Sequence, residues 1–155
     1  MRKNTKLPKR TALPDPKYNN PVIGKFIQYI MREGKKSVAR EIVYDAFTYI
    51  EEKAKRDPVE IFDEAIKNAS PMLELKSRRV GGANYQVPIQ VRSDRRTLLA
   101  IRWVIGAARS RKGAAMSRKL GEELLAASRN EGAAIKKKDD THRMAQANRA
   151  FAHFA

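Results

Sequence analysis

Apolar side chains recur every three or four positions in three stretches of the first half of the chain, and this spacing predicts three amphipathic helices. The first stretch follows Asn20 and Pro21, a capping residue and a proline suited to the first helical position, and extends to Gly34. Its buried side is expected to consist of Ile23, Phe26, Ile27, Ile30 and Met31.

The second helix is expected to begin near Lys35 and to end at the break formed by residues 55–58. Asp57 and Glu60 then resemble a capping box, which opens a third helix that ends at Pro71. The buried stripe of the second helix is expected to be Val38, Ile42, Val43, Ala46, Phe47 and Ile50.

After Pro71 the pattern changes to a period of two residues, which predicts β-strands at residues 72–80 and 85–91. Gly81 to Asn84 are expected to form a four-residue hairpin loop between them. Pro88 cannot donate a hydrogen bond in a central strand, so we expect a two-stranded arm rather than a larger sheet. Charged side chains lie on both sides of the ribbon near its tip, so the tip cannot be buried in an apolar core.

Three more helices are expected after the hairpin. Ser93 and Asp94 are predicted to cap a fourth helix that ends near Ser110. A fifth helix is expected over about residues 115–128, and a sixth from about 132 to the C-terminus.

The predicted fold class is therefore all-α dominated: a bundle of about six helices with one protruding two-stranded β-hairpin between the third and fourth helices. We expect residues 1–19 to form a basic extended arm, because they are rich in lysine and proline and lack apolar periodicity. Residues 20–155 are expected to form a single helical domain, with the hairpin arm at about 72–91.

The charge of the chain is unevenly distributed. There are 33 Lys and Arg residues against 17 Asp and Glu residues, and the formal net charge is +16. Residues 1–36 carry a net charge of +8, residues 37–75 carry −4, residues 76–119 carry +11 and residues 120–155 carry +1. We therefore expect the two basic stretches to converge in space into one surface that binds a polyanion.

Several other classes of function are excluded or disfavoured. The chain has no cysteine, so it has no disulfide, thiolate metal site or cysteine nucleophile. It has no apolar run as long as a signal peptide or membrane span, so we expect a cytoplasmic protein without a membrane partner. His142 and His153 lack the spacing of metal ligands, and no glycine-rich phosphate loop is present. The sequence predicts no enzyme and no cofactor.

Four carboxylates near the start of the third helix allow an alternative hypothesis, a nuclease site: Asp57, Glu60, Asp63 and Glu64. Acidic residues at this end of a helix are favoured by the helix dipole, so the simpler interpretation is structural. Cleavage of RNA in the presence of magnesium, abolished by Asp63→Ala, would support the nuclease.

The fourth predicted helix carries Arg95, Arg102 and Arg109 at intervals of seven residues, close to two helical turns, so they form one stripe. Arg92 and Arg96 widen the stripe at its start. Arginine can bind phosphate through two parallel hydrogen bonds or stack on an exposed base, which favours structured RNA as the ligand. The alternative is a solvated basic face, but residues 76–119 contain only one acidic residue for twelve basic ones.

The hairpin and the last helix have two interpretations each. Arg78, Arg79, Asn84 and Tyr85 combine charge, hydrogen bonding and a stacking ring, as used on looped RNA, although the glycines alone require only a tight turn. In the last helix, basic residues surround two aspartates that can neutralise them within the helix. The basic residues are Lys136, Lys137, Lys138, Arg143 and Arg149, with His142, and the aspartates are Asp139 and Asp140.

Over essentially its full length, the chain resembles the family of bacterial small-subunit ribosomal protein seven. The resemblance rests on Asn20-Pro21-Val22, Phe26-Ile27, Gly34-Lys35-Lys36, Ile42-Val43 with Ala46, the run Lys76-Ser77-Arg78-Arg79-Val80-Gly81-Gly82-Ala83-Asn84-Tyr85-Gln86-Val87-Pro88, and Val91-Arg92 before the arginine-rich helix with Trp103. It implies a structural protein that binds the 3′ major (head) domain of 16S ribosomal RNA and nucleates assembly of the head. It also implies a hairpin near the exit-site (E-site) transfer RNA and the messenger RNA path, contact of the C-terminal region with small-subunit ribosomal protein eleven, and other head proteins as neighbours.

Charge and resemblance together predict the residues that contact RNA. Those expected to bind ribosomal RNA are Arg2, Lys3, Lys9, Arg10, Lys25, Lys35, Lys36, Lys76, Arg78, Arg79, Arg92, Arg95, Arg96, Arg102, Arg109, Arg111, Lys112, Arg118, Lys119, Lys136 and Arg143. Those expected near transfer and messenger RNA are Arg79, Gly81, Gly82, Ala83, Asn84 and Tyr85. The alternative function is an architectural protein that grips duplex DNA, since a basic arm and a basic helix can also bind duplex phosphates.

Overall fold

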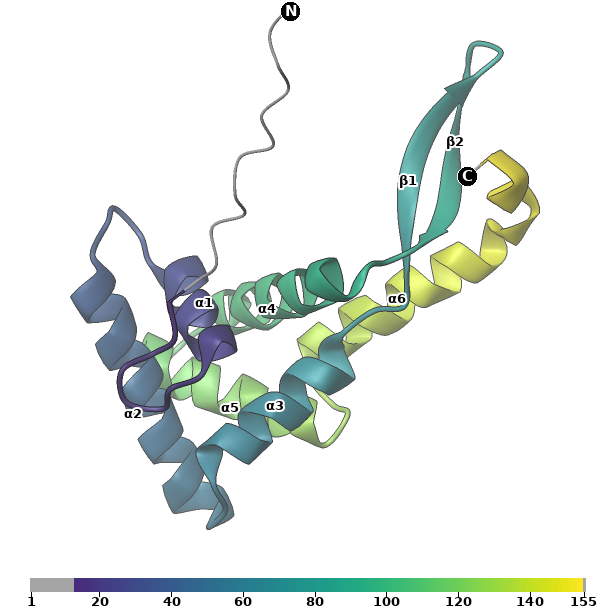
Figure 1. Cartoon of the computed structure of the whole chain (residues 1–155). Coiled ribbons are helices and arrows are strands. Elements are labelled where there is room, and N and C mark those ends of the chain that lie inside the picture. Colours follow the sequence, from purple (N-terminus) through teal and green to yellow (C-terminus); the bar gives the residue numbers. More distant parts are fainter. Residues whose placement is uncertain (1–12, 155) are drawn as a thin grey trace, which may run out of the picture.

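The computed structural model describes residues 13–154, which form six α-helices, a two-stranded antiparallel sheet and a short 3-10 helix (Figure 1). The elements are α1 (Pro21–Ile30), α2 (Lys36–Ala54), α3 (Pro58–Ala69), β1 (Leu73–Val80), β2 (Ala83–Gln90), α4 (Ser93–Ser110), α5 (Met116–Ser128), α6 (Ala133–Ala147) and η1 (Arg149–Phe154). This arrangement confirms the predicted fold class. Among the described helices, none is both long and apolar enough to cross a membrane.

Helix α5 lies at the centre of the bundle and packs against α2, α3 and α4. Helix α1 covers α2 and α4, while α6 packs along α4 and reaches the base of the hairpin. The largest fully buried side chains are Phe26, Phe47 and Phe62, which come from α1, α2 and α3. Their rings meet, with centroids 5.1 Å apart for Phe26 and Phe62 and 5.7 Å apart for Phe47 and Phe62. Burial of each such ring contributes roughly 1.5–3 kcal/mol, so this cluster ties the first three helices together.

The hairpin projects from the bundle, as the alternating pattern predicts, but its turn is shorter than expected. Val80 pairs with Ala83, so the turn has two residues, Gly81 and Gly82, and the predicted four-residue loop is wrong. Both glycines have positive φ, +56° and +89°, which is the conformation that the favoured two-residue hairpin turns require. Asn84 consequently lies within β2 rather than in the loop.

Some helix boundaries also differ from the predictions. Helix α1 ends at Ile30, so Met31 lies just outside it, and Val38 at the start of α2 is 48% exposed instead of buried. Helix α4 begins at Ser93 itself, and no side chain caps it. Helix α6 ends at Ala147 and is followed by η1 rather than continuing to the C-terminus.

The described part of the predicted arm, residues 13–19, lies against the bundle. The carboxylate of Asp15 accepts hydrogen bonds from the backbone amides of Lys17 and Tyr18, at 3.0 and 3.2 Å, and from the Tyr44 hydroxyl. Asp15 is buried, and the Tyr18 ring meets Phe47 with 5.2 Å between centroids. Burial and the hydrogen bond to Asp15 raise the pKa of Tyr44. These contacts anchor the segment that precedes α1.

The crossing of α2 and α5 depends on a glycine. A Cβ atom at Gly121 would lie 2.7 Å from Cδ1 of Tyr49 and 3.2 Å from the carbonyl oxygen of Ala46. We expect Gly121→Ala to lower the free energy of unfolding by about 1–3 kcal/mol, as overpacking does, measured by urea denaturation. Gly106→Ala is the matched control, because a Cβ atom there meets nothing within 4 Å. It should raise stability by about 0.5–1 kcal/mol, and equal effects of the two substitutions would contradict this account.

Candidate nucleic-acid interface

A hollow of about 420 Å³ lies where the loop between α1 and α2 meets α4 and α5. Its apolar lining comes from Ile30, Met31, Val38, Ala39, Ile42 and Met116, and its basic lining from Arg32, Lys35, Arg109 and Lys119. The 48% exposure of Val38 is explained by its position in this hollow. Two of the basic residues come from the first basic stretch of the sequence and two from the second. Within the described residues, the structure therefore brings the end of the first basic stretch to the end of the second.

The electrostatics of this hollow favour an anion. Burial lowers the pKa of the Arg109 guanidinium, and the nearby charge of Arg32 lowers it further. Nη2 of Arg109 donates a hydrogen bond of 3.2 Å to the carbonyl oxygen of Ile30 at the end of α1, which holds the guanidinium at the wall. Within residues 13–154, Lys35 pairs with Glu33, and no acidic residue lines the hollow. An anion bound here would offset the repulsion between the two arginines.

The arginine stripe of α4 connects this hollow to the base of the hairpin. Arg102, in the middle of the helix, is exposed and lies over the Tyr29 ring of α1, 5.5 Å from its centroid. Arg95 at the start of the helix forms an ion pair with Glu74 of β1, with 2.7 Å from Nε to Oε1. Arg96 donates a hydrogen bond to the carbonyl oxygen of Val91. Part of the stripe is therefore used to join α4 to the hairpin.

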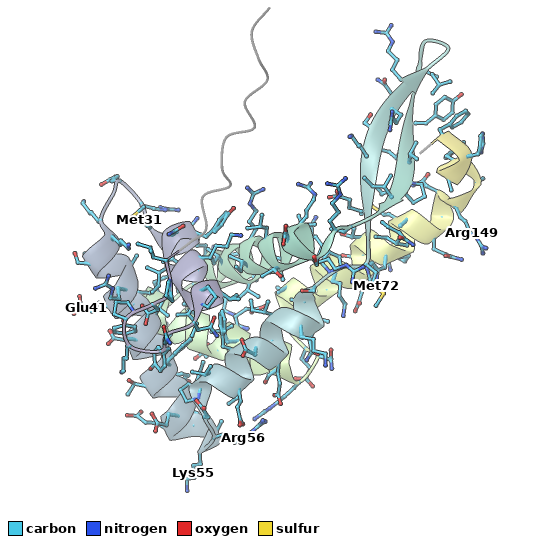
Figure 2. All side chains as sticks on the ribbon, in the orientation of Figure 1. Met31, Glu41, Lys55, Arg56, Met72 and Arg149 are labelled. Carbon is cyan, nitrogen blue, oxygen red and sulfur yellow. The ribbon has the colours of Figure 1, made fainter. Side chains whose placement is uncertain are left out.

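A second hollow, of about 530 Å³, lies at the hairpin base. Its lining is Glu74, Leu75, Lys76, Ile89, Gln90, Arg92 and Arg95. The loop between α1 and α2 and the hairpin rise on the same side of α4, so the helix forms the floor between two raised ends (Figure 1). In Figure 2, the label of Met31 marks the end beside the loop between α1 and α2, and the label of Met72 marks the foot of the hairpin. The surface along α4 therefore joins two hollows, and basic residues line both of them and the helix between them.

The hairpin extends this basic surface at one end. Arg78 and Arg79 are exposed near the tip, opposite Tyr85 and Asn84 on the partner strand. The Tyr85 ring, expected to be available for stacking, instead meets Phe151 and Phe154 of η1, at 5.1 and 5.3 Å between centroids. The charged groups of Arg78 and Arg79 and the amide group of Asn84 remain exposed to solvent at the tip.

Other predicted residues lie away from this surface or are already paired. Arg111 binds the fully buried carboxylate of Glu123, with 2.6 Å from Nη2 to Oε2. Arg118 pairs with Glu122 and lies beside the groove between α2 and α5 that Asp45 and Glu52 line. Both guanidinium groups are therefore held by carboxylates of the chain itself.

The rest of the predicted list is dispersed. Lys36 lines a separate hollow on the side of α1 and α2 where residues 13–16 pack. Lys112 and Lys136 are exposed, and Lys25 on α1 is half-buried. The predicted contacts at Arg2, Lys3, Lys9 and Arg10 fall outside the described residues.

The last helix favours the structural interpretation of its charges. Lys138 donates a hydrogen bond of 2.8 Å to the carbonyl oxygen of Asn68, and Arg143 pairs with Asp140 at 2.7 Å. Nε2 of His142 accepts a hydrogen bond from the backbone amide of Met72. The bonds of Lys138 and His142 connect α6 to α3 and to the residue before β1, and the pair of Arg143 with Asp140 lies within α6.

The acidic residues of α3 are structural as well. Asp57 accepts a hydrogen bond from the amide of Val59 and caps the helix, while Glu60 and Glu64 pair with Arg56. Burial, with the charge of Asp57, raises the pKa of Asp63. Residues 13–154 hold no group of three metal-ligating side chains that could bind an ion.

Three features of the site are not predicted by the sequence: the places of Arg32 and Arg40 and the burial of Glu123. Arg32 lines the hollow, and Arg40 lines the neighbouring one beside Lys36. The proximity of Arg32 to the Lys35-Lys36 pair was a usable signal, because a basic residue in the same short loop shares its surface. The burial of Glu123 had no such signal, because nothing in the sequence distinguishes this buried glutamate from its half-exposed neighbour Glu122.

This arrangement can bind a charged, folded polymer that combines phosphates with unpaired bases. Cations along such a surface can follow a phosphate backbone, and an apolar floor accepts a planar ring.

A family model described as ribosomal protein S7p/S5e matches residues 1–149. Small ribosomal subunit protein uS7 of Desulfatibacillum aliphaticivorans is 55% identical over 99% of both chains, and that of Thermotoga neapolitana is 56% identical over 94% of both. The protein of the same name from Nitrosomonas europaea is 54% identical over 99% of both chains.

Proposed function

Since the chain belongs to the ribosomal protein uS7 family, we propose that the surface along α4, between the two hollows, is where it binds 16S ribosomal RNA. Members of this family are structural, non-enzymatic components of the small subunit of the cytoplasmic ribosome, and they act in translation. The predictions of a ribosomal RNA-binding protein without catalytic activity are confirmed at this level. We propose, in addition, which residues of this chain contact the RNA.

The single observation that carries the proposal is the hollow beside α1, where residues from both basic stretches surround an apolar floor. Arg102 continues the positive charge along α4 towards Lys76 and Arg92 at the hairpin base. Each such cation can neutralise one phosphate and release its condensed counterions. A backbone that follows α4 would pass Arg32 and Lys119 at one end and Arg92 at the other.

The floor of the hollow indicates what kind of RNA fits. Met31, Val38 and Met116 offer an apolar surface, and a base can contact this surface only when the base is unstacked. We infer that one unpaired nucleotide places its base against these side chains and its flanking phosphates near Arg32 and Lys119. Single-stranded or bulged segments within a folded RNA present such nucleotides, and regular duplexes do not.

Family membership suggests the finer role as well. The proposal is that the chain binds the 3′ major domain, nucleates head assembly, and places the hairpin near the E-site transfer RNA and the messenger RNA path. Small-subunit ribosomal protein eleven at the C-terminal region and other head proteins are the proposed neighbours. The exposed Arg78, Arg79 and Asn84 support the role of the hairpin, because the tip presents charge and hydrogen-bonding groups to an RNA.

A comparison of nucleic acids tests the proposal. At matched salt concentration, the full chain should bind a folded fragment of the 3′ major domain of 16S RNA at least about a thousand-fold more tightly than duplex DNA of equal length, measured by filter binding. Equal affinity would instead support the architectural DNA-binding function. A chemical footprint on the 16S RNA then locates the contacts, and Arg78→Gln with Arg79→Gln should remove only the protections made by the hairpin.

A further inference from the structure

The distal half of the hairpin has little support of its own. Every residue of β1 from Lys76 to Val80 is exposed, and at the tip of β2 only Tyr85 is partly covered. Helix α6 contacts both strands of the hairpin, and Val87, which pairs with Lys76 in the middle of the ribbon, is fully buried. An isolated two-stranded ribbon is marginally stable in water, so the distal half needs a further contact to keep one direction.

The C-terminal 3-10 helix provides that contact. Helix η1 lies beside β2, and its rings meet Tyr85: the centroid of Phe151 lies 5.1 Å away with planes at 50°, and that of Phe154 lies 5.3 Å away with planes at 36° (Figure 1). The His153 ring lies 4.0 Å from the Phe154 centroid and extends the cluster. Aromatic pairs at such separations attract beyond their simple burial.

Helix η1 depends on the hairpin in return. It is a six-residue 3-10 helix, a length that is uncommon because the geometry of its hydrogen bonds is poor, and none of its residues is buried. Its contacts with β2 are the tertiary contacts that hold it, apart from those with the preceding α6. The distal half of the hairpin and η1 are each only marginally stable alone, and they stabilise each other through one aromatic cluster.

We propose that η1 is an intramolecular brace: Phe151 and Phe154, packed on Tyr85, set the direction of the distal hairpin, and release of η1 frees it. The strand register determines which face the brace covers. Tyr85 shares its face with Arg78, directly opposite, whereas Arg79 and Asn84 point to the other face. When η1 is packed on the hairpin, Arg79 and Asn84 are therefore accessible to a ligand. The Tyr85 ring is covered by η1 and is not accessible to that ligand.

Hydrogen exchange on the full-length chain tests the brace. In the variant Phe151→Ala with Phe154→Ala, the paired amides of residues 76–86 should exchange at least about ten-fold faster, as expected for the loss of two aromatic pairs. The amides of α2, α3 and α4 should be unchanged. Tyr85→Ala should accelerate the exchange of η1 by a similar factor. The matched control is Arg149→Gln, an exposed residue at the start of η1, labelled in Figure 2, which should change neither.

Two outcomes would overturn the proposal. Unchanged exchange in the hairpin of the double variant would show that η1 does not support it, and equal acceleration in the helices would show that the rings belong to the global fold. A second measurement is independent of exchange. Because the chain has no cysteine, spin labels can be placed at Ala83→Cys and Lys67→Cys, both exposed. Their distance distribution should broaden in the double variant and stay narrow in the Arg149→Gln control, and an equally narrow distribution in both would refute the brace.

Discussion

The triple variant Arg32→Gln, Arg102→Gln and Lys119→Gln is expected to bind the 16S RNA fragment on the order of a hundred-fold more weakly than the unaltered chain. These side chains lie along the proposed path of the RNA backbone and, in the described residues, form no ion pair with a carboxylate. Each lost phosphate contact should also reduce the slope of log affinity against log salt by about one, so the triple variant should lose up to about three. Binding titrations at several salt concentrations measure both quantities.

The control must remove the same charge elsewhere. Lys53→Gln, Lys55→Gln and Lys67→Gln alter three exposed lysines on α2, α3 and the connection between them, with an identical change in net charge. If this variant weakened binding as much as the first, general charge rather than the surface along α4 would account for affinity. Arg95 is left out of the test because its ion pair with Glu74 makes its loss affect the hairpin as well.

The largest loss of stability is expected from Glu123→Gln. The Glu123 carboxylate is fully buried, accepts from the Arg111 guanidinium at 2.6 and 3.0 Å, and accepts from the backbone amide of Ala134 at 2.9 Å. The amide side chain of glutamine leaves Arg111 without its buried counter-charge. We expect a decrease of about 3 kcal/mol in the free energy of unfolding, which corresponds to a Tm lower by roughly 10 °C in calorimetry.

The neighbouring residue provides the control for this prediction. Glu122 also pairs with Arg111, at 3.3 Å, and with Arg118, but its side chain is 34% exposed. Water replaces most of what such a pair contributes, so Glu122→Gln should cost less than about 1 kcal/mol. Comparable losses in the two variants would mean that burial of Glu123 does not govern its contribution.

The local pattern was a reliable guide wherever the physical cause is local. Caps, prolines and apolar spacing located the six α-helices of residues 13–154, although not η1, and the alternation after Pro71 located the hairpin, because these signals depend on neighbours in the chain. The errors are of a different kind. The predicted hairpin turn is two residues too long: Ala83 and Asn84 continue the ladder opposite Val80 and Arg79, and the adjacent glycines are themselves a signal for a two-residue turn.

By itself, the sequence determined the helical class, the hairpin, the two basic stretches and the family resemblance that the comparisons confirm. Only the tertiary structure decided which cations share a surface: it placed Arg32 beside Arg109 and committed Arg111 to a buried carboxylate. It also turned Tyr85 towards Phe151 rather than towards solvent. The physical reason is that periodicity reports which side of an element is apolar, whereas the partner of a charge or a ring depends on how distant elements cross.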